Sequence, residues 1–265
     1  MIDSHVEQLC EKIRTVWKCT SSPVSLKKIA DEEGIELAPG NYGNNFHGLL
    51  EYVSAERCFI LYYPDRYSGI SYVRSRFTVA HELGHYFLNA HRTELMNGNS
   101  QKCVVGFLSD NEMEKEADSF SASLLIPRSN MERHIKVRGY MEAQNIIDMA
   151  KELEVSIPCA MIRYVQYAID ACSVIMSENG KVRFHVASDE MAESGYKYLG
   201  WGQTIPPQSA AVKILEKESH KAVASNKGST HSWYSKRPYS CDVWEESYSL
   251  GYGGQVITLL SVIDD

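Results

Sequence analysis

Two histidines four residues apart, with a glutamate directly after the first, could carry hydrolytic chemistry in this chain. They lie in the run His81-Glu82-Leu83-Gly84-His85, which has the pattern HExxH. On a helix, residues four apart share one face, so His81 and His85 can hold a single metal ion from the same side. Glu82 lies one step around the helix, where its carboxylate can reach a water molecule beside that ion. The pattern predicts a metal-dependent hydrolase with Glu82 as its general base.

A catalytic zinc ion needs a third protein ligand, and its fourth position stays open to water. His91 is one candidate, because its distance from the other two histidines has the metzincin spacing. However, Leu88 stands where the metzincin pattern has a glycine, and a branched residue hinders the turn that would bring His91 back. The competing interpretation of His91 is an exposed histidine near the end of the helix.

A second set of candidates lies in an acidic stretch that begins at residue 112 and should form a helix ending at Pro127. Glu114 and Asp118 are four residues apart, so they share one face of that helix. This pair suits Glu114 as the third metal ligand and Asp118 as the carboxylate that holds the outer nitrogen of a ligand histidine. Glu112 and Glu116 are rival ligands. A solvated helix N-terminus, where carboxylates are favoured, is the competing interpretation of the whole run.

Two segments of the sequence resemble the ImmA/IrrE family of zinc metallopeptidases. The first, Arg-Phe-Thr-Val-Ala-His-Glu-Leu-Gly-His-Tyr, starts at residue 76, and the second, Glu-Lys-Glu-Ala-Asp-Ser-Phe-Ser-Ala-Ser-Leu-Leu-Ile-Pro, starts at residue 114. The resemblance is closest over residues 26–127 and is weaker over the following forty or so residues. In that family the third ligand is a Glu four residues before an Asp or Asn. The resemblance therefore implies that His81, His85 and Glu114 bind Zn²⁺, with Asp118 following.

Members of that family cleave or release helix-turn-helix repressors, and many are encoded on prophages and other mobile elements. The resemblance implies a zinc-dependent endopeptidase that hydrolyses such a repressor and so derepresses genes of a mobile element or a stress response. A non-proteolytic anti-repressor, or a transcription regulator that acts by protein or DNA binding, stays open as the alternative. The chain departs from the family at Ser121, where Ala is usual, and at Asn89 and His91, which replace a more usual His. None of these departures touches the ligands that the resemblance implies.

The composition restricts the partners and the compartment. The net charge is −7, whereas a nucleic-acid binder needs clustered Lys and Arg, so direct DNA binding is not expected. The seven cysteines are scattered and form no CxxC pair, which is typical of free thiols in a reducing cytosol. The first residues carry charge and lack the apolar core of a signal peptide, and no apolar stretch is long enough to span a membrane. We therefore expect a cytoplasmic protein without a membrane partner.

The patterning predicts an α+β fold in three parts. Residues 1–128 should form a zincin-like metallopeptidase domain, with two strands between residues 49 and 63 ahead of the metal helix. Residues 129–170 should form a helix-turn-helix-like segment, and Arg163 is the only basic residue of its second helix, which favours packing over DNA recognition. Residues 171–265 should form a small α+β domain with a hairpin turn at Asn179-Gly180. Its many aromatic residues suit either a sensing or partner-binding surface or core packing.

Overall fold

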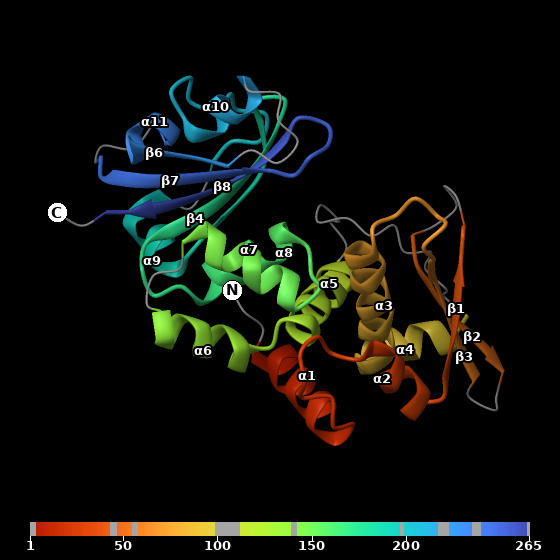
Figure 1. Ribbon diagram of the computed structural model, residues 1–265. Coiled ribbons are helices and arrows are strands. Elements are labelled where there is room, and N and C mark those ends of the chain that lie inside the picture. The colour runs from red at the N-terminus through yellow and green to blue at the C-terminus, as the bar shows by residue number, and fades with distance from the viewer. Residues whose placement is uncertain are drawn as a thin grey trace. The chain divides into compact units, whose positions relative to one another are not determined.

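The computed structural model describes residues 4–42, 47–54, 58–98, 112–138, 142–196, 199–216, 223–234 and 240–263. The chain is α+β, and it divides into two compact units (Figure 1). The N-terminal unit consists of residues 2–130 and 150–156, and the C-terminal unit consists of residues 131–149 and 157–265. The three-part division at residues 128/129 and 170/171 stays a prediction. In the described part of the chain, no helix combines the length and the apolar character needed to cross a membrane.

The N-terminal unit contains the helices α1 (Ser4–Val16), α2 (Leu26–Glu32), α3 (Tyr72–Phe87), α4 (Asn89–Met96) and α5 (Glu112–Leu125). Helices α2, α4 and α5 contact the predicted metal helix α3, and α1 packs against α5. The HExxH run lies within α3, and the acidic run opens α5, which ends two residues before Pro127 as the sequence predicts. Helices α3 and α5 lie side by side (Figure 1). Buried Arg14 of α1 donates to the carbonyl of Leu124, which fixes the C-terminal end of α5.

A three-stranded sheet accompanies these helices, in the order β1-β3-β2. Its strands are β1 (Ile35–Gly40), β2 (Leu49–Ser54) and β3 (Cys58–Pro64). Strands β2 and β3 pair antiparallel, as predicted, whereas β1 pairs parallel with β3 and was not expected from the sequence. Buried Leu50, Phe59 and Leu61 give the sheet an apolar side. Among the described residues β2 has no second strand partner, so it is an edge strand of this sheet.

Helices also occupy the described part of residues 128–167, where the sequence predicts a helix-turn-helix-like segment. They are α6 (Arg128–Arg138), α7 (Ala143–Glu152) and α8 (Ile157–Tyr167). Arg163 of α8 is only 2% exposed, and its guanidinium lies over the ring of Tyr167. A buried arginine cannot contact a DNA phosphate. Arg163 therefore has a packing role in α8, and the function of the segment stays a prediction.

The C-terminal unit contains a five-stranded antiparallel sheet in the order β5-β4-β8-β7-β6. Its strands are β4 (Cys172–Glu178), β5 (Lys181–Ala187), β6 (Val223–Ser229), β7 (Asp242–Ser249) and β8 (Gln255–Val262). The predicted turn between β4 and β5 is present, with φ of 49° at Asn179 and 73° at Gly180. Short helices complete the unit: α9 (Asp189–Met191), η1 (Ala192–Tyr196), α10 (Ala210–Glu216) and α11 (Thr230–Trp233).

The aromatic residues of the C-terminal unit serve two purposes. Tyr196, Trp233 and Tyr234 are buried in its core, whereas Trp201 and Tyr252 are 69% and 64% exposed.

The core of the C-terminal unit also contains a fully buried carboxylate, Glu245. Its two oxygens accept hydrogen bonds from the Trp233 indole N–H and from the backbone N–H of Ala210, both at 2.8 Å.

The described cysteines are free thiols. They are Cys10, Cys19, Cys159, Cys172 and Cys241. The side chains of Cys58 and Cys103 lie outside the described part of the chain. The prediction of unpaired cysteines therefore holds for the five that can be checked.

Candidate metal centre

A close approach between α3 and α5 builds the centre. A Cβ atom added to Gly84 of α3 would lie 3.3 Å from the Cα of Ala117 and 3.2 Å from a ring carbon of Phe120, both on α5. A larger side chain at position 84 would push the two helices apart. Gly84 is therefore the residue of the HExxH run that lets the acidic helix come near the histidines.

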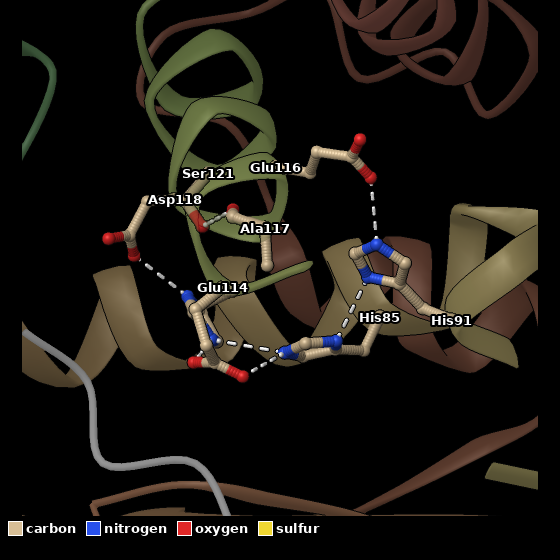
Figure 2. Close-up of polar contacts among 8 residues, drawn as sticks. His85, His91, Glu114, Glu116, Ala117, Asp118 and Ser121 are labelled. Carbon is tan, nitrogen blue, oxygen red and sulfur yellow. Dashed lines mark hydrogen bonds and ion pairs between the residues drawn. The ribbon is translucent and has the colours of Figure 1, made fainter. Parts of the chain in front are cut away.

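Three of the predicted site residues converge at this helix pair (Figure 2). The Nε2 atoms of His81 and His85 are 3.2 Å apart. The two carboxylate oxygens of Glu114 lie 3.3 Å from His81 Nε2 and 3.5 Å from His85 Nε2. All three side chains are buried, and their ligand atoms lie within 4.8 Å of one another. The structure thus brings together the residues that the sequence analysis placed around one metal ion.

The chemistry of these three groups fits a divalent cation. Two imidazole nitrogens and one carboxylate form a ligand set found in catalytic zinc sites. Burial lowers the pKa of His81, but the hydrogen bonds to Asp118 and Glu114, together with nearby negative charge, raise it to about 10. Burial and the adjacent charge of His81 lower the pKa of His85 to about 3. A cation at the point where the nitrogens meet would satisfy both imidazoles at once, so His81, His85 and Glu114 fit a divalent metal ion.

Asp118 lies where the sequence analysis placed it. Its Oδ1 atom is 2.9 Å from His81 Nδ1, the nitrogen that points away from the centre. A carboxylate only accepts, so His81 carries its proton on Nδ1 and leaves Nε2 for a metal.

His91 and Glu116 occupy positions that the sequence analysis did not foresee. His91 is 1% exposed, so the interpretation as an exposed histidine was wrong. It lies on α4, with its Nδ1 3.0 Å from His85 Nδ1 and its Nε2 2.9 Å from Glu116 Oε2 (Figure 2). Neither residue belongs to the converging group. The third rival ligand, Glu112, is exposed and pairs with Lys115.

Glu82, the predicted general base, is fully buried next to the centre. The start of the edge strand lies directly against it: a Cβ atom on Gly48 would stand 2.4 Å from Glu82 Oε1 and 2.5 Å from Thr78 Cγ2. Any larger residue at position 48 would displace Glu82, Thr78 or the strand. This contact cannot be predicted from the sequence, because nothing local relates residue 48 to residue 82.

A buried arginine anchors the N-terminal part of α3. Arg76 donates to the carbonyl of Val24 at 3.1 Å and to the carbonyl of Glu154 at 3.2 Å. Its guanidinium also lies 3.6 Å from the carboxylate of Glu154. These contacts connect the helix that carries both histidines to two distant parts of the same unit.

Comparison with known families agrees with this geometry. Residues 71–163 match the profile of peptidase family M78, described as the IrrE N-terminal-like domain. The matched range contains His81, Glu82, His85, Glu114 and Asp118. This segment is similar to the IrrE N-terminal-like domain.

A solved structure is also similar in fold to nearly the whole chain. This structure, a Mycobacterium tuberculosis transcriptional regulator, aligns with 98% of this chain and 76% of its own, with a TM-score of 0.62 and 9% identity. At that identity the likeness shows a shared fold alone. None of the curated proteins compared with the chain matches it.

Proposed function

We propose that the protein is a zinc-dependent endopeptidase that cleaves a helix-turn-helix transcriptional repressor and so derepresses the repressor's genes. The observation that carries the proposal is the buried convergence of His81, His85 and Glu114, with Glu82 one residue from the first ligand. The IrrE N-terminal-like domain supports a peptidase as the class of enzyme. The family resemblance and the fold shared with a transcriptional regulator support a substrate connected with gene regulation.

Each residue of the centre has a role in peptide hydrolysis. His81, His85 and Glu114 would hold the zinc ion, which when bound supplies Lewis acidity that polarises the scissile carbonyl and acidifies water. Glu82 takes a proton from the attacking water and later delivers it to the leaving amine. Asp118 keeps the His81 ring in the orientation and tautomer that a ligand needs.

The edge strand offers a place for an extended substrate. Strand β2 begins one residue after Gly48, whose backbone lies against Glu82. An extended peptide can pair with the open side of an edge strand through main-chain hydrogen bonds. A peptide paired with β2 would run past the general base. This arrangement supports a zincin-like organisation of the N-terminal unit, and the free thiols support a cytoplasmic setting.

The test compares protein termini in host cells that express the wild type, Glu82→Gln or Glu112→Gln. Glu82→Gln removes the base, whereas Glu112→Gln makes the same chemical change at an exposed position of α5. We expect one new cleavage in a helix-turn-helix repressor with the wild type and the control, and none with Glu82→Gln. If both variants and the wild type induce the repressor's genes without any cleavage, the protein acts by binding and the endopeptidase proposal fails.

A further inference from the structure

We infer that His91 and Glu116 form a hydrogen-bond relay that sets the tautomer of His85 and thereby strengthens metal binding. The inference rests on the proposed metal centre and adds two positioning residues to it. The relay runs from His85 Nδ1 to His91 Nδ1 at 3.0 Å and from His91 Nε2 to Glu116 Oε2 at 2.9 Å (Figure 2).

Hydrogen-bond chemistry allows only one neutral arrangement of this chain. The Glu116 carboxylate can only accept, so His91 carries a proton on Nε2. A neutral imidazole with a proton on Nε2 has an acceptor at Nδ1, and the facing Nδ1 of His85 must then donate. His85 therefore has its lone pair on Nε2, the atom that faces His81 and Glu114.

The opposite arrangement would disable the ligand. If His91 donated from Nδ1 as well as from Nε2, His85 would have to accept at its own Nδ1. His85 would then be neutral with its proton on Nε2, where it would occupy the lone pair that a metal needs.

A sharp helix junction makes the relay possible. Leu88 is the single residue between α3 and α4, and it adopts an extended conformation with φ −77° and ψ 110°. Its N–H bonds to the carbonyl of Gly84, and its carbonyl accepts from Arg92. The chain therefore turns without a glycine. The turn brings His91 to the Nδ1 atom of His85, so His91 lies beside a proposed ligand and is not itself one of the three converging groups.

The two ligand histidines are thus held in different ways. His81 donates directly to the carboxylate of Asp118, whose side chain is 17% exposed. His85 reaches its carboxylate through a second imidazole, and the Glu116 side chain is 51% exposed. Removing such outer partners typically weakens metal affinity by about 10–100-fold. Loss of the middle member, His91, should have the larger effect of the two relay positions, because His91 contacts His85 directly whereas Glu116 acts only through His91.

The test is a zinc titration of the metal-free full chain against a competing chelator. We expect His91→Leu to weaken zinc binding by about 10–100-fold. His91→Asn, whose amide oxygen can still accept from His85, should recover part of that loss. Glu116→Ala removes the acceptor of the His91 Nε2–H and should weaken zinc binding less than His91→Leu does, and Glu112→Gln is the exposed control. Circular dichroism of each metal-free variant checks the fold.

Nitrogen NMR of the imidazoles gives a second readout, which a merely structural role would not move. We expect the proton of His85 on Nδ1 and that of His91 on Nε2 in the zinc-loaded protein. Wild-type zinc affinity in a folded His91→Leu variant would overturn the relay and leave the proposed metal centre intact. Complete loss of zinc in that variant, equal to that in Glu114→Ala, would make His91 a ligand instead. A wild type that binds no zinc would overturn the metal centre itself and the relay with it.

Discussion

The contact between Gly48 and Glu82 gives a sharp prediction for Gly48→Ala. The new Cβ atom would stand 2.4 Å from Glu82 Oε1, whereas an ordinary carbon–oxygen contact is about 3.3 Å. The carboxylate or the strand must therefore move by roughly 0.9 Å. Glu82 is fully buried, so its carboxylate has little room to move. The new Cβ atom would also stand only 2.5 Å from Thr78 Cγ2. A shift of about 1 Å in a catalytic group can lower turnover by about 100-fold.

The assay separates the general base from the metal. Neither Gly48 nor Thr78 belongs to the three converging groups, so zinc affinity should stay within about threefold of the wild type while cleavage of the repressor falls by about 100-fold. Overpacking of this kind also lowers the free energy of unfolding by about 1–3 kcal/mol. Thermal unfolding of the zinc-loaded protein measures that part.

A matched control is Gly200→Ala. A Cβ atom at Gly200 would meet its nearest neighbour, in Gln203, at 3.6 Å, which is an ordinary contact. This variant should cleave as the wild type does. Full cleavage by a folded Gly48→Ala variant would refute the reasoning, because Glu82 would then tolerate a displacement that should remove it from its working position.

Three further predictions concern stability and reactivity. Arg14→Met removes the donor to Leu124 and to two loop carbonyls and should lower the free energy of unfolding in urea by about 3 kcal/mol; a loss below about 1 kcal/mol would contradict this account. Glu245→Gln turns one acceptor into a donor facing the Trp233 N–H or the α10 N-terminus, and we expect a loss of about 2 kcal/mol in the same assay. Burial raises the pKa of Cys172 to about 12, so in the native protein at pH 8 its alkylation should be about 1000-fold slower than that of an ordinary cysteine, as mass spectrometry can measure. Because the unfolded thiol ionises at lower pH than the folded one, this group lowers stability as the pH rises above its ordinary pKa of 9.

The sequence alone predicts the parts of the centre that depend on helical spacing. His81 and His85 share a face because they are four apart, and the same rule places Glu114 and Asp118 together on α5. The family resemblance then selects Glu114 from among its acidic neighbours. These inferences need only one helix at a time, so they do not depend on the path of the chain between helices.

The contacts that the sequence does not reveal all depend on nonlocal geometry. The position of His91 follows from the turn at Leu88, which the sequence analysis took as an obstacle because it expected a glycine there. Strand β1 was missed because its partner β3 follows more than twenty residues later and pairs in parallel. Strand β6 carries the polar run Val-Ala-Ser-Asn-Lys-Gly-Ser, which lacks a strand-like apolar pattern, and its conformation depends on pairing with β7.

The interleaved order of the two units has a consequence for synthesis of the chain. Residues 150–156 belong to the N-terminal unit, although residues 131–149 belong to the other one. Within this short return segment, Glu154 accepts from Arg76 at the start of the histidine-bearing helix. A ribosome releases residues in order, so the nascent chain can complete the metal-binding unit only after residue 156 has emerged. A shortened chain that stops at residue 130 would leave the guanidinium of Arg76 without its Glu154 partner, and ribosome-stalled chains of increasing length should therefore acquire zinc affinity in a step rather than gradually.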